Sequence, residues 1–356
     1  MFRPRIILLA AAAASALALA SCETAPPTAP VEAPPAPVVP PPPPVAVTPR
    51  VVELAGAFEA YMERTAAVTP AFTQGADVER SLTLAAAYEP RQLASGAVAY
   101  AAVAALQDAA FVESVRQYAR NPAQRAEVAA NIVRDPAYVV GVPNSAGAAG
   151  LAYSALNNHG MRVRIAGEQV KQAAYSVQKQ AWSKVAIPNR EQRLANVKAL
   201  ASSLAPAEPP VIERLRAVAL GQQPSSLTGS SQQPPYTPVV VRGMAIAALS
   251  ALGYAEDPVW AASIQNLLNE PTNSAGASYC LNLSKMNLNQ CLAVSKPWYE
   301  DVFCLGQHVM IDTGQCIVQA AGSAPAAVVP TAVTPSSAAT PVATTASAAA
   351  AGSGGR

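Results

Sequence analysis

Cysteine is the residue type whose number and spacing point most directly to chemistry in this chain of 356 residues. Four of the five cysteines lie in one segment near the carboxyl end, at Cys280, Cys291, Cys304 and Cys316, and the fifth is Cys22. Thiols in this arrangement can form two disulfides, hold a metal ion or carry a covalent group. The residues around them decide among these possibilities.

The segment before Cys22 has the features of an export signal. Two arginines precede an apolar run over 6–19, and the run ends in the letters LASC at 19–22. These four residues resemble the lipobox of bacterial lipoproteins, in which the cysteine is linked to diacylglycerol and becomes the first residue of the mature chain. The resemblance covers the first 22 residues only, and it implies that 1–21 is a lipoprotein signal peptide and that Cys22 is lipidated.

Two other interpretations of this segment stay open, an uncleaved membrane anchor and ordinary cleavage without a lipid. The apolar run is shorter than the roughly 20 residues that span a bilayer, which disfavours the anchor. Position 23 is Glu rather than the Asp that tends to retain lipoproteins in the inner membrane of well-studied Gram-negative bacteria. We therefore expect a lipid-anchored protein of the cell envelope, attached to the outer membrane and facing the periplasm.

The four clustered cysteines of an exported protein are expected to form disulfides. Cys280 and Cys291 are eleven residues apart, which is about 16 Å along one helix, so they share a face but are too distant to bond. If 295–297 turns the chain back, Cys291 meets Cys304 and Cys280 meets Cys316. This nested pairing would staple a helical hairpin, similar in construction to twin-Cys hairpins such as the mitochondrial CX9C proteins.

One spacing opposes the nested pairing. The twelve residues from Cys304 to Cys316 overshoot three helical turns by about 100°. Asp312-Thr313-Gly314 is also typical of a helix end, so sequential pairing of 280 with 291 and of 304 with 316 stays open. Zinc binding is disfavoured because the CxxC spacing is absent and periplasmic thiols are oxidised, and we expect no metal or other cofactor.

Few residues suggest catalysis. His159 and His308 lack HExxH spacing and an evident acidic partner, and the chain has no GxSxG, P-loop or dinucleotide motif. Residues 312–314 resemble the aspartic-protease signature, but that chemistry needs two such carboxylates in a β-rich fold. Glu113-Ser114 matches a pair in one lytic-transglycosylase family, without its Gly-Leu-Met-Gln segment. The sequence therefore favours a protein without catalytic activity.

The elements that position these residues are expected to be helices. Several Asn, Asp or Thr residues are followed directly by Pro, the pattern of an N-cap before the first helical residue, at 121–122, 135–136, 237–238 and 257–258. Small apolar side chains recur at helical spacing over 161–185 and predict one long helix with a close-packed stripe. No run alternates as a strand would. The predicted fold is all-α, a helical bundle or array with a disulfide-stapled C-terminal hairpin between disordered arms.

Changes in composition divide the chain into six parts. They are the signal peptide at 1–21, a Pro-rich stalk at 22–50, a helical region at 51–220, a linker or long loop at 221–236, a Cys-containing helical region at 237–320 and an Ala/Ser/Thr/Pro tail at 321–356. The stalk is expected to be extended, because its prolines lack the backbone donors of a helix or sheet. The tail is expected to be disordered, because it has too little large apolar surface to fold. Whether the two helical regions share one core is left open.

Charge and hydropathy exclude two classes of protein. The chain has 24 Lys and Arg against 22 Asp and Glu, so it lacks the basic excess of a nucleic-acid binder. Beyond the signal no run of about 18 apolar residues remains, which excludes a polytopic membrane protein. We expect a lipoprotein held in the bilayer through acylated Cys22 that acts as a non-catalytic scaffold or binds an envelope protein or cell-wall polymer. The alternative is an envelope hydrolase acting on peptidoglycan or another surface polymer.

Overall fold

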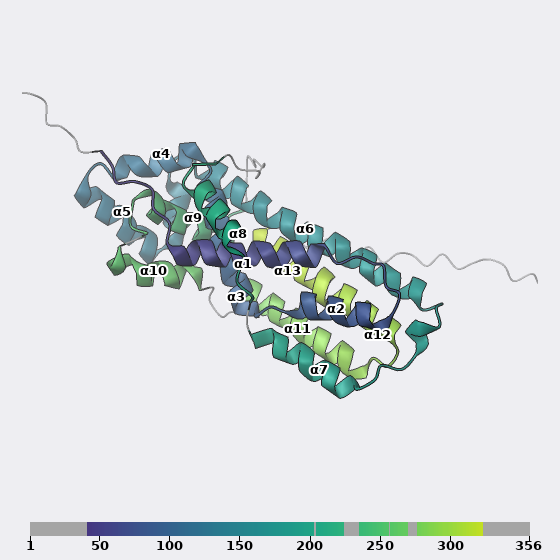
Figure 1. The fold of residues 1–356 in the computed structure, drawn as a ribbon. Helices are drawn as coiled ribbons and strands as arrows, with labels where there is room; N and C mark the ends of the chain where they lie inside the picture. The colour runs from purple at the N-terminus through teal and green to yellow at the C-terminus, as the bar shows by residue number, and fades with distance from the viewer. Residues whose placement is uncertain (1–40, 203, 224–234, 256, 270–275, 323–356) are drawn as a thin grey trace, which may run out of the picture. The chain divides into compact units, whose positions relative to one another are not determined.

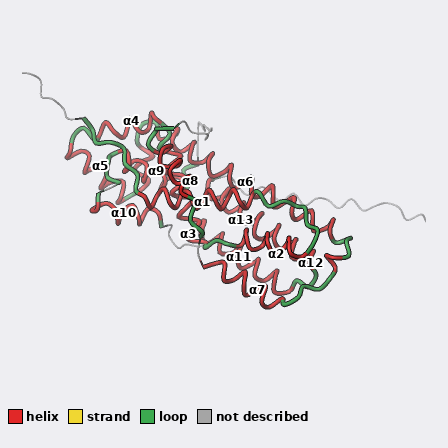
Figure 2. Tube along the Cα trace, viewed as in Figure 1, coloured by secondary structure: helices red, strands yellow, loops and turns green. Residues whose placement is uncertain are grey.

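The computed structural model describes residues 41–202, 204–223, 235–255, 257–269 and 276–322. These residues form thirteen α-helices, three 3₁₀ segments and one π-helical segment, and they contain no β-strand (Figure 2). The predicted all-α class is confirmed. The signal peptide, Cys22, most of the stalk, and the tail after 322 lie outside the described residues.

Six of the thirteen described α-helices begin at a proline, and in five of them the side chain of the preceding residue caps the helix. The α-helices are α1 (Pro49–Ala66), α2 (Gly75–Ala86), α3 (Pro90–Ala105), α4 (Ala109–Tyr118), α5 (Pro122–Arg134), α6 (Ser145–Val177), α7 (Arg190–Ala199), α8 (Pro209–Ala219), α9 (Pro238–Ala251), α10 (Pro258–Leu268), α11 (Ala277–Val294), α12 (Trp298–Cys304) and α13 (Asp312–Ala321) (Figure 1). The 3₁₀ segments are η1 (Pro136–Gly141), η2 (Trp182–Lys184) and η3 (Leu200–Ser202), and the π-helix is η4 (Leu305–Ile311). The side chains of Asn121, Thr237 and Asp257 each accept a backbone N–H of the first turn that follows.

One continuous core joins the two helical regions that the sequence separates. Helix α3 packs between α1, α6 and α9, and α13 lies along α6. Both α3 and α9 are buried on nearly every side, which is the pattern of central core helices. The segment 221–236 therefore connects two parts of one compact unit. No described helix is long and apolar enough to cross a membrane by itself, although α3 and α4, bent by 88°, reach that length and hydropathy together.

The end of the Pro-rich stalk belongs to this core, so the boundary at residue 50 is corrected. Val47 is 3% exposed, and the N–H of Ala46 donates to the carbonyl of Ser250 at 3.2 Å. Arg116 donates to the carbonyl of Pro43 at 2.8 Å. Proline lacks an N–H but keeps its carbonyl acceptor, so a proline-rich segment can still accept hydrogen bonds from donors on neighbouring helices.

Helix α6 is longer and begins earlier than the predicted 161–185. Val163, Val170, Ala174 and Val177 of the predicted stripe are buried, but α6 starts at residue 145 and ends at 177. The last two members of the stripe, Ala181 and Val185, lie beyond the helix and are exposed. His159, two residues before the predicted helix, lies inside α6. Close packing against α13 explains why the helix continues through this glycine-containing segment. A Cβ on Gly160 would lie 2.8 Å from the carbonyl oxygen of Gly314 on α13. A glycine that normally weakens a helix here permits a close crossing.

Candidate functional site

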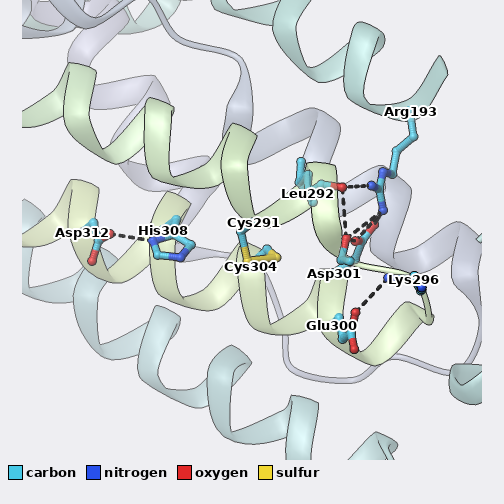
Figure 3. Close-up of a disulfide and its surroundings, with 10 residues drawn as sticks. Arg193, Cys291, Leu292, Lys296, Glu300, Asp301, Cys304, His308 and Asp312 are labelled. Atoms are coloured by element: carbon cyan, nitrogen blue, oxygen red, sulfur yellow. Dashed lines mark hydrogen bonds and ion pairs between the residues drawn. A yellow bond between two sulfur atoms is a disulfide. The ribbon is translucent and has the colours of Figure 1, made fainter. Parts of the chain in front are cut away.

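The two disulfides join the cysteines in nested order. Cys280 is bonded to Cys316 and Cys291 to Cys304, with Cα atoms 5.6 and 5.7 Å apart. Both bonds link α11 to the helical arm formed by α12, η4 and α13, as Figure 3 shows for the second pair. The sequential pairing is therefore excluded, and the hairpin is closed near its turn and near its open end.

A π-helical segment resolves the spacing that opposed this pairing. Residues 312–314 do not end the helix, because the backbone continues without a break from α12 through η4 into α13. In a π-helix each N–H bonds to the carbonyl five residues back, so a turn contains one more residue than in an α-helix. The twelve residues from Cys304 to Cys316 then cover the angle of eleven α-helical residues, and both thiols face α11. Thr313 and Gly314 are buried inside the arm.

A buried ion pair holds the turn of the hairpin. Arg193 on α7 donates to the two carboxylate oxygens of Asp301 at 2.5 and 2.6 Å, and their side chains are only 6% and 0% exposed (Figure 3). The hydroxyl of Ser295 donates to the same carboxylate at 2.6 Å, and Arg193 also donates to the carbonyl of Leu292. This set ties α7 to the junction of α11 and α12, and no local sequence signal predicted it.

The prediction that His308 lacks an acidic partner is wrong. Its Nδ1 lies 2.9 Å from the carboxylate of Asp312, four residues later (Figure 3). Gln307 donates to the other Asp312 oxygen at 2.9 Å, and Lys171 of α6 donates to Gln307 at 2.7 Å. The network joins η4 to α6 on a partly exposed surface. Among the described residues no group of three His, Cys, Asp or Glu side chains could hold a metal ion.

An apolar groove of about 450 Å³ lies beside the Cys291–Cys304 disulfide, and we call it the disulfide groove. Its walls come from the end of α6, the end of α11 and one face of α12. Tyr175 and Phe303 meet edge to face with ring centroids 6.4 Å apart. Tyr175 is 52% exposed and Val294 is 73% exposed, so large apolar side chains face solvent here. The lining residues are Ala174, Tyr175, Gln178, Cys291, Val294, Ser295, Tyr299, Glu300, Phe303 and Cys304.

A second pocket, of about 410 Å³, contains a chain of buried polar groups, and we call it the Glu59 pocket. Tyr100 on α3 donates to the carboxylate of Glu59 on α1 at 3.2 Å, and Nε2 of His159 on α6 lies 3.1 Å from the same hydroxyl. Arg214 on α8 forms an ion pair with the other oxygen of Glu59. The lining residues are Glu59, Glu63, Tyr100, Ala155, Asn158, His159, Met161, Arg162 and Ile165.

Burial shifts the pKa values of Glu59, Tyr100 and His159, the three hydrogen-bonded side chains of this pocket. Glu59 is 5% exposed, and desolvation raises its pKa although Arg214 acts in the opposite direction. Desolvation, reinforced by the Glu59 charge, also raises the pKa of Tyr100. The pKa of His159 falls to about 4, mainly through burial. At neutral pH the imidazole and the phenol are therefore uncharged, and the charges of the pocket belong to carboxylates and guanidiniums.

The sequence pattern pointed to one member of this pocket and not to the others. His159 is present, whereas Glu113 lies elsewhere, on α4, in an exposed pair with Arg120 at 3.5 Å. Glu59 and Tyr100 were not singled out. A signal did exist, because Glu59 follows Phe58 on the apolar side of α1, and a carboxylate at such a position needs a buried partner.

A second set of buried polar side chains joins α11 and α13 to the segment before α3. We call it the Lys285 cluster, and it consists of Tyr88, Ser284, Lys285 and Thr313. Lys285 is 5% exposed, its Nζ donates to the carbonyl of Ala86 at 2.5 Å, and it lies 4.3 Å from the centre of the Tyr88 ring. Burial lowers the pKa of Lys285 to about 8. The hydroxyls of Tyr88, Ser284 and Thr313 bond to one another. None of these four side chains lines the disulfide groove or the Glu59 pocket.

The fold and its covalent links define an all-α protein with a disulfide-stapled helical hairpin. Comparison with known proteins finds no protein family, no curated protein and no solved structure that matches this chain.

Proposed function

We propose that this protein is a membrane-anchored lipoprotein of the cell envelope that acts without catalysis by binding a partner protein at the disulfide groove. Its leader directs export, Cys22 carries the lipid anchor, and the Pro-rich stalk connects this anchor to the helical body. Disulfides persist mainly in oxidising compartments, so the two bonds that close the hairpin support export from the cytosol. Attachment to the outer membrane facing the periplasm is part of the proposal.

The observation that carries the binding role is the exposed apolar groove beside Cys291–Cys304. Aromatic side chains are enriched at the centres of protein interfaces, where a few buried rings supply most of the affinity. Tyr175, Tyr299 and Phe303 line the groove, and the disulfide holds its two helices at a constant separation. A partner that inserts an apolar or aromatic side chain would cover this surface without rearranging the body.

A photo-reactive side chain at Tyr175 tests this role in cells. We expect a defined cross-linked product with one envelope protein, and none when the same group replaces Tyr138, a tyrosine of similar exposure on η1. Identical products from both positions, or no product from Tyr175, would contradict the groove as a docking site. Anchoring is tested separately by Cys22→Ala, which should abolish fatty-acid labelling and membrane retention.

A second candidate function is an envelope hydrolase acting on peptidoglycan or another surface polymer. The observation in its favour is Glu59, a buried carboxyl group with a raised pKa beside a pocket, which is the environment of a general acid. Its close pairing with Arg214 acts against proton donation, because the guanidinium favours the charged carboxylate. Release of soluble cell-wall fragments by the wild-type protein, lost in Glu59→Gln, would favour this candidate over the non-catalytic role.

A further inference from the structure

The Glu59 pocket combines two negative and two positive side chains. Glu59 and Glu63 are one turn apart on α1, Arg162 stands on α6, and Arg214 reaches Glu59 from α8. His159 is uncharged at neutral pH because its pKa is about 4. The formal charges therefore balance, and a ligand with a net charge would disturb this balance. A small ligand that carries one charge of each sign would preserve it.

The buried carboxylate retains capacity for a further donor. One oxygen of Glu59 accepts from Tyr100 and the other from Arg214, and each carboxylate oxygen can accept two hydrogen bonds. Because burial removes water from this carboxylate, the positive charge of Arg214 only partly replaces the lost solvation. A positively charged N–H donor in the pocket would supply a short charge-assisted bond.

The two charged side chains at the rim are free to meet a ligand. Glu63 and Arg162 are both exposed, and within the described residues neither forms an ion pair. They come from α1 and α6, the two helices between which the pocket opens. Met161 and the 47% exposed Ile165 add an apolar wall. The rim thus presents a carboxylate that can bind a cation, a guanidinium that can bind an anion, and a small apolar surface.

We propose that the Glu59 pocket binds a small zwitterion, an α-amino acid or a short peptide with free ends. Its ammonium group bonds to Glu59 and Glu63, and its carboxylate bonds to Arg162. The volume of about 410 Å³ lies within the range of about 300–1,000 Å³ found for small-molecule pockets. This site is separate from the disulfide groove, and its occupation does not depend on the partner proposed there.

Isothermal titration calorimetry of the detergent-solubilised full chain tests the proposal with alanine and alanyl-alanine as probes. N-acetylalanine lacks the ammonium group and alaninamide lacks the carboxylate, and we expect each to bind at least about tenfold more weakly than the better zwitterion. The single amino acid and the dipeptide separate the two sources, because their charges are different distances apart.

Two exposed residues supply the variants, so folding is not at risk. Glu63→Gln and Arg162→Gln should each weaken zwitterion binding about tenfold, whereas Glu127→Gln on α5 and Arg80→Gln on α2 should leave it unchanged. No heat of binding from either zwitterion up to about 10 mM would overturn the proposal, because a site weaker than that has little specific affinity. Equal binding of N-acetylalanine, or of a neutral sugar such as methyl glucoside, would also overturn it.

Discussion

The Glu59 pocket and the Lys285 cluster both bury an ionisable side chain against a tyrosine hydroxyl or ring, but they end differently. In the first, the hydrogen-bonded chain from His159 through Tyr100 reaches a carboxylate at an open pocket. In the second, Lys285 ends on a backbone carbonyl, and Tyr88, with 1% of its surface exposed, is sealed under α11. A buried polar group is therefore no sign of function by itself. Access from solvent and unpaired charge at the rim separate a binding site from a structural lock.

The largest effect should come from a site that is both charged and sealed, the Arg193–Asp301 pair. Arg193→Met leaves Asp301 buried without its counter-charge, and we expect a loss of about 3–5 kcal/mol in the free energy of unfolding. Arg120→Met is the matched control, because its pair with Glu113 is exposed and should contribute less than about 1 kcal/mol. Urea unfolding measures both variants. Similar small losses would show that burial of the pair does not matter.

The Lys285 cluster should make the free energy of unfolding depend on pH in the alkaline range. The pKa of Lys285 is about 8 in the folded protein against an ordinary value of 10.5, so above pH 8 the unfolded state binds more protons. The free energy of unfolding should rise from pH 8 towards 10, by up to about 3 kcal/mol in all, and Lys285→Met should lack this rise. Urea unfolding is compared up to about pH 9, where tyrosine ionisation in the unfolded chain is still small. An unchanged slope in Lys285→Met would show that this ammonium group is not sealed.

The Glu59 pocket should respond at the opposite end of the pH range and more weakly. His159 has a pKa of about 4 when folded against an ordinary value of 6.5, so the unfolded state binds more protons between these values. Stability is therefore lost as pH falls from 6.5 to 4, by about 1–2 kcal/mol because the pocket opens to solvent, which screens part of the burial penalty. His159→Gln should flatten this part of the curve. A steeper acid loss in the variant would assign the proton uptake to another group.

Local signals predicted much of the fold but little of the pocket. Capping side chains before prolines marked the starts of α5, α9 and α10, because an N-cap bond involves only residues within one turn. Helical spacing favoured the nested disulfides once a turn was placed at 295–297, but the interval from Cys304 to Cys316 left sequential pairing open. The start of α6 and the continuity through 312–314 were missed, because glycines that end an isolated helix are kept where α6 and α13 cross.

The sequence by itself determined the helical class and the start of several helices, since each depends on side chains within a few turns of one another. The even number of clustered cysteines also indicated two disulfides. Only the tertiary structure decided which charges are sealed and which remain accessible. Glu59, Tyr100, His159 and Arg214 come from four different helices, and their distances depend on how those helices pack. The same packing selected a π-helical turn over an α-helical one, because it brings Cys304 and Cys316 onto the face that meets α11.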